Sequence, residues 1–185
     1  MKFVNALLAS ALLATGAAQA QVVTAVPSSA EVMVGDFFTV DLIVSGLGDA
    51  TVGSFDFDFI YDPFVMTSYG VTFGEGLDVF SLGSLFSVSS QPGLINIFQT
   101  SFDTVADLIA LQPDMFTLAT LSFKAISPGS SSLEVFVNAI GDAEGVTLPV
   151  ELGAGLVSAV PEPQTYALLL AGLGLIALSA RRRRS

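Results

Sequence analysis

Three of the twenty amino acids are absent from this chain. It contains no cysteine, no histidine and no tryptophan. Without cysteine, neither a disulfide framework nor a thiolate zinc site can form, and without histidine the commonest general base and transition-metal ligand is missing. A folded domain in this chain therefore relies on its hydrophobic core, and the usual catalytic constellations are disfavoured.

Positive charge is almost as scarce. Six lysines and arginines stand against seventeen acidic residues. Five of the six lie near the ends of the chain, and between residues 21 and 160 Lys124 is the only cation against sixteen acids. A body with a net charge of about −15 repels phosphate backbones, so we expect no nucleic-acid partner.

Residues 1–20 have the layout of a secretory signal peptide. Lys2 supplies an early positive charge, an apolar run follows, and the segment ends in small residues. Ala18 and Ala20 fit the small-x-small rule of signal peptidase, which predicts Gln21 as the mature N-terminus. We therefore expect export, with signal peptidase as the first processing enzyme.

The other end of the chain has a second apolar run. Residues 165–180 are sixteen uncharged, mostly apolar residues. As a helix at ~1.5 Å per residue they span about 24 Å, slightly less than a ~30 Å hydrocarbon core. Arginines that follow such a span stay cytoplasmic, which places the preceding domain outside. Here four arginines follow directly: Arg181, Arg182, Arg183 and Arg184.

Just ahead of this span stand Pro161, Glu162 and Pro163. Two prolines around a glutamate disfavour a helix on this side of the span, so the motif stays extended at the outer membrane–water boundary. The motif, the short span and the arginine cluster, in that order, resemble the PEP-CTERM sorting signal of Gram-negative bacteria. The resemblance implies processing by an exosortase, usually in bacteria that make extracellular polysaccharide. A permanent single-span anchor is the alternative.

Between these ends the chain reads as a series of short strands. Apolar and polar residues alternate with period two from Gln21 to about Val157, and Gly, Pro, Ser and Asp turns interrupt the runs. Eight to ten such strands indicate an all-β sandwich. The residues expected to face the core in three of the runs are Phe38, Val40, Leu42 and Val44; Ala119, Leu121, Phe123 and Ala125; and Leu133, Val135 and Val137.

One helical pattern interrupts the strands at residues 103–113. Asp103 is a candidate cap, and Pro113 closes the segment. Val105, Leu108 and Ile109 share one face of this short helix.

The stretch "GSFDFDFIYDP", residues 53–63, poses the question of a metal or catalytic site. Its aromatic residues occupy every second position and point one way, whereas Asp56 and Asp58 point the other way. The spacing fails as an EF-hand, because the positions that need an oxygen ligand, a glycine and a glutamate hold other residues. The stretch is therefore predicted to be a strand with a solvent-exposed acidic face. The aromatic residues are Phe55, Phe57, Phe59 and Tyr61.

Catalytic and metal sites have little support in the sequence. Ser122 and Lys124 share a strand face, but a catalytic dyad also needs a buried lysine and an oxyanion hole. A lone lysine in an acidic domain is better explained as a solvated or salt-bridged cation. Calcium binding by loop acids remains an alternative. The loop acids are Asp49, Asp62, Asp78 and Asp142.

The tyrosines at positions 61, 69 and 166 are candidates for stacking on a sugar.

Residues 34–74 resemble the opening half of a cohesin or a related carbohydrate-binding-type domain. The shared features are a Gly-Asp-x-Phe strand, a Phe-x-Phe-Asp strand and a Tyr-Asp-Pro turn. Residues 118–135 resemble the late pair of strands of the same fold. The resemblance implies a nine-stranded jelly-roll sandwich without catalytic residues. Cohesins proper bind dockerins, but the loops beside these motifs depart from the pattern of cellulase complexes, so we do not expect a dockerin partner.

The sequence thus predicts three parts: a signal peptide at 1–20, a cohesin-like sandwich of about nine strands at 21–157, and a sorting signal with a transmembrane helix at 158–185. We expect a non-catalytic binding or structural module without a cofactor. It would be anchored first in the inner membrane and then reach the cell surface or extracellular matrix of a Gram-negative bacterium. Exopolysaccharide, biofilm or another envelope protein is the expected partner, and a calcium-dependent or polysaccharide-binding, lectin-like module is the alternative.

Overall fold

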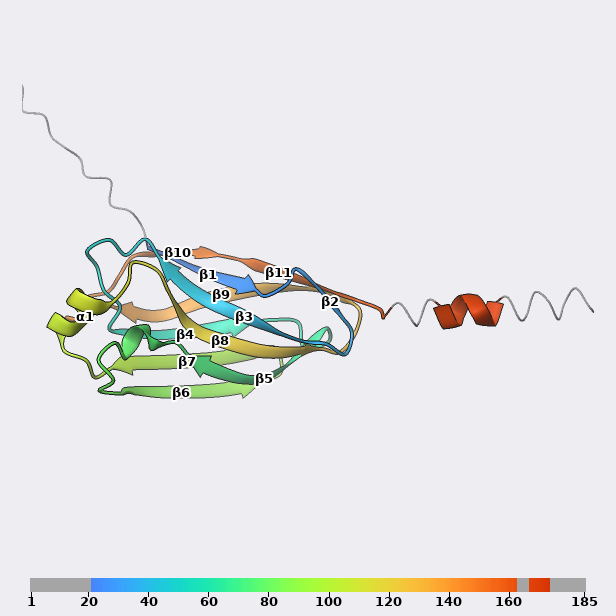
Figure 1. Cartoon of the computed structure of the whole chain (residues 1–185), viewed down its shortest axis with the longest axis horizontal. Coiled ribbons are helices and arrows are strands. Elements are labelled where there is room, and N and C mark those ends of the chain that lie inside the picture. Colours follow the sequence, from blue (N-terminus) through green and yellow to red (C-terminus); the bar gives the residue numbers. More distant parts are fainter. Residues whose placement is uncertain (1–20, 163–166, 174–185) are drawn as a thin grey trace, which may run out of the picture.

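The computed structural model of the chain describes residues 21–162 and 167–173. Residues 21–160 fold into two facing β-sheets, with a short α-helix and a 3-10 turn near one end (Figure 1). In chain order the elements are β1 (Gln21–Pro27), β2 (Glu31–Met33), β3 (Phe37–Ser45), β4 (Ser54–Ile60), β5 (Met66–Phe73), η1 (Glu75–Leu77), β6 (Ser84–Gln91), β7 (Leu94–Ser101), α1 (Val105–Leu111), β8 (Phe116–Ala125), β9 (Gly129–Gly141), β10 (Val150–Gly153) and β11 (Gly155–Val160).

The two sheets have five and six strands, in the orders β10-β1-β3-β8-β5 and β2-β11-β9-β4-β7-β6. Neighbouring strands run antiparallel, except that β10 pairs with β1 and β2 with β11 in parallel. The predicted β-sandwich is confirmed. The described residues form eleven strands rather than about nine, because β2 and β10 add three and four residues at two sheet edges. Strands of three or four residues are too short to show an alternation of apolar and polar residues in the sequence.

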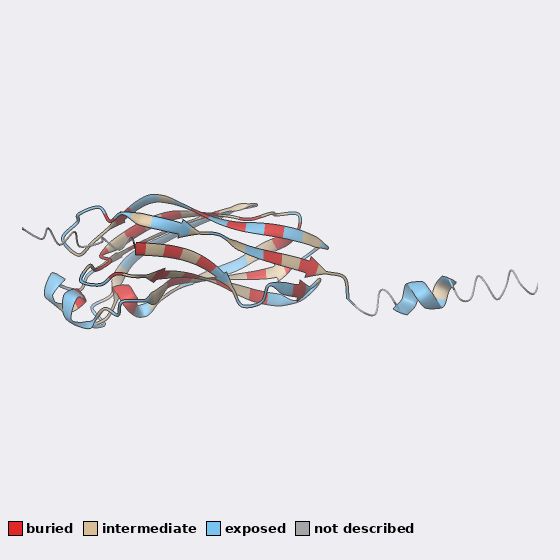
Figure 2. Ribbon diagram, turned by 90° about the horizontal axis from the view of Figure 1, so that it is seen from above, coloured by how far each residue is buried: buried red, intermediate tan, exposed pale blue. Residues whose placement is uncertain are grey.

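The residues that alternation assigned to the core are the buried ones. Figure 2 shows buried residues alternating with more exposed ones along the strands. On β3 the four predicted core residues are all buried, while the residues between them are half-buried. The same holds for the four predicted core residues of β8. On β9, Leu133 and Val135 are buried and Val137 is half-buried. The sandwich core therefore follows directly from the period-two pattern.

An aromatic cluster on β4 fills the middle of the core. This strand lies between β9 and β7 in the six-stranded sheet, and its three phenylalanines, together with the tyrosine that follows it, are buried. From the opposite sheet, the ring of Phe123 lies 5.8 Å from that of Phe59 and 5.1 Å from that of Tyr61, between ring centroids. Complete burial of such a side chain contributes about 1.5–3 kcal/mol. The aromatic side chains of this segment thus pack directly against the opposite sheet.

Helix α1 is capped by a different residue from the one predicted. Thr104 is the N-cap, and its side-chain oxygen accepts a hydrogen bond from the backbone N–H of Asp107 at 3.2 Å. The prediction of Asp103 as cap is wrong. A carboxylate oxygen of Asp103 instead accepts from the backbone N–H of Phe80, at 3.3 Å, and so ties the helix to the loop before β6.

The helix also touches the core less than its pattern suggests. Of the predicted apolar face only Leu108 is buried, whereas Val105 and Ile109 are exposed. The helix has seven residues and lies at one end of the sandwich rather than across a sheet (Figure 1). An apolar stripe on so short a helix reaches the core at a single position.

Strand β11 continues to Val160, past the predicted domain end at residue 157, so Pro161 and Glu162 follow the sandwich directly. Residues 167–173, within the predicted membrane span, are helical. In the described part of the chain no helix has both the length and the apolar character needed to cross a bilayer. The predicted signal peptide, Pro163 and the four arginines lie outside the described residues.

Candidate binding surface

The outer face of the six-stranded sheet carries two carboxylates joined by side-chain amides. The amide nitrogen of Asn96 on β7 donates to Oδ1 of Asp56 at 2.7 Å and to Oδ1 of Asp58 at 2.8 Å. The amide nitrogen of Asn138 on β9 also donates to Oδ1 of Asp56, at 3.2 Å. These four side chains, which we call the acid–amide cluster, link three neighbouring strands at the surface.

Strand geometry explains how the cluster forms. Asp56 and Asp58 point outward because the phenylalanines between and beside them point into the core. Asn96 lies directly opposite Asp58 in the β4–β7 register, and its two amide hydrogens serve one aspartate each. The β4–β9 register shifts between Asp56 and Phe57, as in a β-bulge, and this irregularity brings Asn138 beside Asp56.

The cluster presents two anionic groups that are held in place. Both aspartates are half-buried, and each accepts its amide hydrogen bonds through Oδ1. Among the described residues, the structure gives the Oδ2 atoms of Asp56 and Asp58 no hydrogen-bond partner. Carboxylates form their strongest hydrogen bonds with charged donors. The cluster is therefore suited to accept lysine or arginine side chains from a partner.

Exposed apolar side chains flank the cluster on the same face. Phe136 on β9 lies opposite Asp58 in the strand register and is 50% exposed. Leu85 on β6 and Leu156 on β11 are exposed further out on this face. Apolar anchors beside complementary charges are the usual composition of a protein–protein contact. The described part of this face has no cation, because Lys124 lies on β8 in the other sheet.

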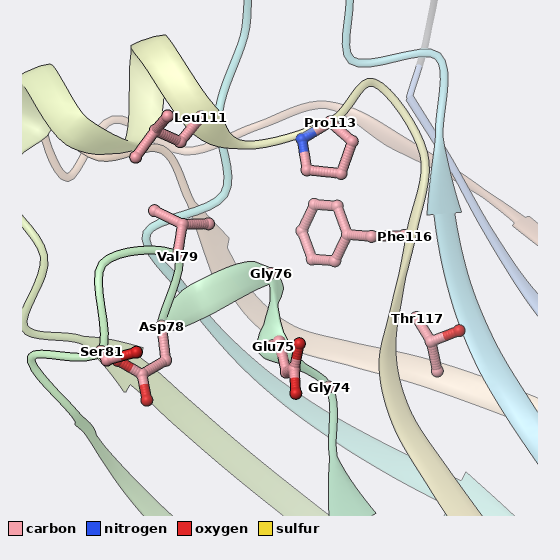
Figure 3. A pocket seen from close by; sticks show the side chains of 10 residues that line it. All are labelled: Gly74, Glu75, Gly76, Asp78, Val79, Ser81, Leu111, Pro113, Phe116 and Thr117. Carbon is pink, nitrogen blue, oxygen red and sulfur yellow. The ribbon is translucent and has the colours of Figure 1, made fainter.

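A separate hollow of about 670 Å³ opens beside η1 and α1. Figure 3 shows the carboxylates of Glu75 and Asp78 on one side of it, and Leu111, Pro113 and Phe116 on the other. Oδ1 of Asp78 already accepts from the backbone N–H of Gly83 at 2.8 Å, which closes the loop before β6. One of the two carboxylates, that of Asp78, is thus engaged in the turn, so the hollow is a weaker candidate than the sheet face.

The aspartates considered as calcium ligands do not converge. Asp62 and Asp142 lie at opposite ends of β4, since Ser54 at its start pairs with Gly141. Oδ1 of Asp62 accepts from the N–H of Phe64, and Oδ1 of Asp142 from that of Val146, both at 2.8 Å. Within residues 21–162 and 167–173 no three acidic side chains gather around a common point. Calcium binding stays a prediction to which these residues give no shared site.

The remaining aspartates of that set also lie in loops. Asp49 lies between β3 and β4, and Asp78 follows η1. Neither contributes to the acid–amide cluster.

The aromatic residues suggested for sugar stacking separate into different environments. Tyr61 is 5% exposed and belongs to the core, so its assignment to a sugar platform is wrong. Tyr69 on β5 is 61% exposed and meets Phe37 of β3 edge-on, with ring centroids 4.9 Å apart. The ammonium of Lys124 lies 5.3 Å from the Phe37 ring centroid. Tyr166 lies outside the described residues.

The start of the sorting motif lies against the sandwich. The backbone N–H of Val34 donates to the carbonyl of Val160 at 2.9 Å, so pairing extends to the last residue before the motif. Glu162 is exposed, and its carboxylate lies close to Gly35 in the turn between β2 and β3.

Sequence reasoning placed Asp56 and Asp58 on a wet face but missed their partners. Asn96 lies in "LINIFQTS" and Asn138 in "SSLEVFVNA", both of which alternate like any half-buried strand. Phe136 looked like a routine outward residue in the same run. Their role depends on which strands become neighbours of β4, and alternation does not supply that information.

Two protein-family models match this chain, one over the sandwich and one over the C-terminal segment. A model of the cohesin domain matches residues 22–152, and a model of the PEP-CTERM protein-sorting motif matches residues 159–184. No curated protein matches the chain in sequence.

Solved cohesin structures share the fold at low sequence identity. A non-cellulosomal cohesin from the archaeon Archaeoglobus fulgidus has 20% identity and a TM-score of 0.60, covering 80% of this chain and 96% of that one. The cohesin–dockerin complex Coh-OlpA-Doc918 from Clostridium thermocellum has 18% sequence identity and a TM-score of 0.61, covering 75% of this chain and 99% of that one. A type II cohesin from Acetivibrio cellulolyticus has 14% identity and a TM-score of 0.62, covering 75% of this chain and 95% of that one. Since the family model covers most of the chain, the chain belongs to the cohesin domain family and carries a PEP-CTERM sorting motif after the domain.

Proposed function

We propose that this protein is an exported cohesin module that binds a protein partner through the outer face of its six-stranded sheet. Cohesin domains are non-catalytic binding modules, and a sorting motif marks the chain for export. The observation that carries the proposal is the acid–amide cluster. Its two carboxylates are held by Asn96 and Asn138 and lie beside the exposed ring of Phe136.

The chemistry of this face supports a partner of complementary charge and polarity. A surface with lysine or arginine side chains around an apolar centre would match both the carboxylates and the exposed ring. Dockerins are the partners in several of the similar structures, including the complex from Clostridium thermocellum. The loops made a dockerin unexpected from sequence alone, but family membership makes a dockerin-type module the first partner to test. Another envelope protein with a basic, apolar surface is the alternative occupant.

The test is calorimetric titration of the protein with a panel of dockerin modules, using Asp58→Lys and a matched control, Asp41→Lys. Asp41 is also half-buried, faces outward and accepts a side-chain hydrogen bond, from Thr120 at 2.6 Å, but it lies on the other sheet. We expect Asp58→Lys to weaken binding at least about tenfold, or ~1.4 kcal/mol, and Asp41→Lys to leave it unchanged. Equal effects of the two variants, or no binding by any dockerin, would contradict this assignment.

Processing by an exosortase forms the second part of the proposal. The sorting-motif match includes Glu162, which is exposed directly after the last strand. We expect Glu162 to be the recognised charge and Arg181 to Arg184 to stop transfer through the membrane. Glu162→Ala, or deletion of the four arginines, should then trap uncut protein in the inner membrane. Intact-mass measurement of surface protein checks this, and a mature species that still carries the arginines would show that the segment is only an anchor.

The destination that we propose is the cell surface or extracellular matrix of a Gram-negative bacterium, in association with exopolysaccharide. One structural observation favours direct polysaccharide contact: Phe37 and Tyr69 form an exposed aromatic pair with Lys124 beside it, on the opposite sheet from the acid–amide cluster. Aromatic faces stack on sugar rings, and the ammonium would attract an acidic sugar. Tyr69→Ala should reduce retention on immobilised exopolysaccharide, whereas Asp58→Lys should not. The reverse pattern would exclude this surface.

A further inference from the structure

Strand β6 forms an edge of the six-stranded sheet without the usual protection against further pairing. Its eight residues, "SLFSVSSQ", include no charged residue and no proline. Its register with β7 is continuous from Ser84 to Gln91, so no bulge bends it away. Natural edge strands are normally blunted by charge, proline, a bulge or shortness. This strand has none of these features, although it belongs to a strongly acidic domain.

The other sheet edges of the described domain differ from β6. Strands β2 and β10 have only three and four residues, and they contain Glu31 and Glu151. Strand β5 pairs irregularly with β8 between Ser68 and Gly70, which disturbs its edge. Among the edges formed by residues 21–160, β6 is therefore the one best suited to accept another strand.

Exposed apolar side chains are concentrated on β6. Leu85, Phe86 and Val88 are 55%, 60% and 43% exposed. Phe86 and Val88 lie opposite the buried residues Gln99 and Ile97, so they point to the core side of the sheet, where the facing sheet covers them incompletely. A strand added beyond β6 would cover them.

We propose that a second copy of this chain pairs with β6 in an antiparallel, two-fold arrangement. Ser87 would face the partner's Ser87, and Phe86 would lie beside the partner's Val88. The two six-stranded sheets would then form one continuous sheet. An antiparallel pair about a two-fold axis is self-complementary, and side chains that face each other share one side of the sheet, which this register satisfies.

The self-complementary, uncharged strand β6 makes a second copy the partner, and charge restricts their contact to this edge. Two bodies with sixteen acids and one lysine each repel one another wherever their charged faces meet. The uncharged β6 edge avoids that repulsion. A second copy brings the same uncharged strand, with exposed apolar groups at matching positions.

The antiparallel arrangement also determines whether dimerisation precedes or follows removal of the sorting signal. This conclusion rests on the proposed sorting. The strands run along the long axis of the domain, and β11 delivers the sorting motif at the end of that axis where β2 lies (Figure 1). Pairing through β6 reverses one copy, so the two Val160 ends point in opposite directions. Two precursors whose domains stand upright on the same membrane would point the same way and could not pair like this. The dimer therefore forms after the sorting signal has been removed.

The absence of cysteine makes disulfide trapping a clean test of the register. In an antiparallel pair, facing Cα atoms lie about 4.5–5.5 Å apart, within the range that a disulfide spans. The processed protein with Ser87→Cys should form covalent dimers under mild oxidation. Ser89→Cys, which would face the partner's Leu85, and Thr72→Cys, exposed on the β5 edge, should not. Equal cross-linking of all three would indicate random collision and overturn the proposal.

Charge substitution tests the same contact without covalent chemistry. Ser87→Lys and Ser87→Glu should each convert the dimer to a monomer in sedimentation measurements, and an equal mixture should recover a species of twice the monomer mass. Thr72→Lys and Asp58→Lys should stay dimeric, which separates this contact from the proposed partner-binding face. A wild-type protein that stays monomeric at high concentration would overturn the proposal. Cross-linking of Ser87→Cys in the uncut precursor would overturn the requirement for processing.

Discussion

Asn96 shows how one side chain can organise a surface. Two aspartates at alternate positions of one strand repel each other, and here no cation lies between them in the described structure. The amide of Asn96 gives one hydrogen bond to each, and Asn138 adds another to Asp56. The repulsion is reduced while the formal charge is kept. The carboxylates are therefore held in place without an ion pair inside the described domain.

A residue on the core side of β4 should matter far more for stability than its outward neighbour. Phe57→Asp removes a buried ring, which costs about 3–5 kcal/mol before any cost of burying charge. Asp56→Asn keeps a carbonyl oxygen that can accept from Asn96, so we expect a loss of at most about 1 kcal/mol. Urea unfolding of residues 21–160 measures both. Equal losses would show that the two faces of β4 are assigned wrongly.

Among the elements, β4 has the central place because it contributes to both the core and the candidate surface. It pairs along its full length with β7 and β9, and its aromatic side contacts the opposite sheet. Helix α1, by contrast, contributes one buried residue. The segment from β5 to η1 depends on close backbone approach instead. A Cβ at Gly74 would lie 1.8 Å from the carbonyl oxygen of Thr117, on the neighbouring strand.

Gly74→Ala should therefore destabilise the domain by displacing β5 from β8, with an expected loss of about 1–3 kcal/mol. Gly70→Ala is the matched control, because Gly70 lies in β5, four residues before Gly74, and a Cβ there meets nothing within 4 Å. We expect Gly70→Ala to change stability by less than about 0.5 kcal/mol. Thermal unfolding followed by circular dichroism compares the two. A tolerated Gly74→Ala would mean that the strands separate at little cost.

For the whole molecule, the dominant property is uncompensated negative charge. Sixteen acids and one lysine occupy residues 21–160, and none of the described acids forms an ion pair with Lys124. The ammonium of Lys124 lies over the Phe37 ring instead. Self-repulsion of this kind lowers the stability of a compact state and is screened by salt.

Sodium chloride should accordingly raise the unfolding midpoint, and a gain of about 1 kcal/mol corresponds to roughly 4 °C for a domain of this size. Calcium at matched ionic strength separates screening from specific binding. A clearly larger effect of calcium would support the predicted calcium-dependent alternative. No effect of either salt would show that the charges are too dispersed to destabilise the fold.

Much of the fold was predictable because burial in a two-layer sandwich repeats every second residue. That rule assigned the inward faces of β3, β4 and β8 correctly, and it placed Asp56 and Asp58 at the surface. It failed for β2 and β10, whose three or four residues give no period, and for the cap of α1. Asp103 and Thr104 are both good capping residues, and the choice fell to Thr104 because the Asp103 carboxylate bonds to the distant Phe80.

Local features could be read from the chain alone: an acidic, cysteine-free domain built from alternating strands, and a sorting motif recognisable from its own proline, glutamate and arginine residues. Features that depend on which strands are neighbours became visible only in the folded domain. It set Asn96 and Asn138 against the β4 aspartates, brought Tyr69 against Phe37 at the surface, and left β6 at a sheet edge. The physical reason is that strand order and register arise from contacts between residues far apart in the chain. A period of two carries no information about them.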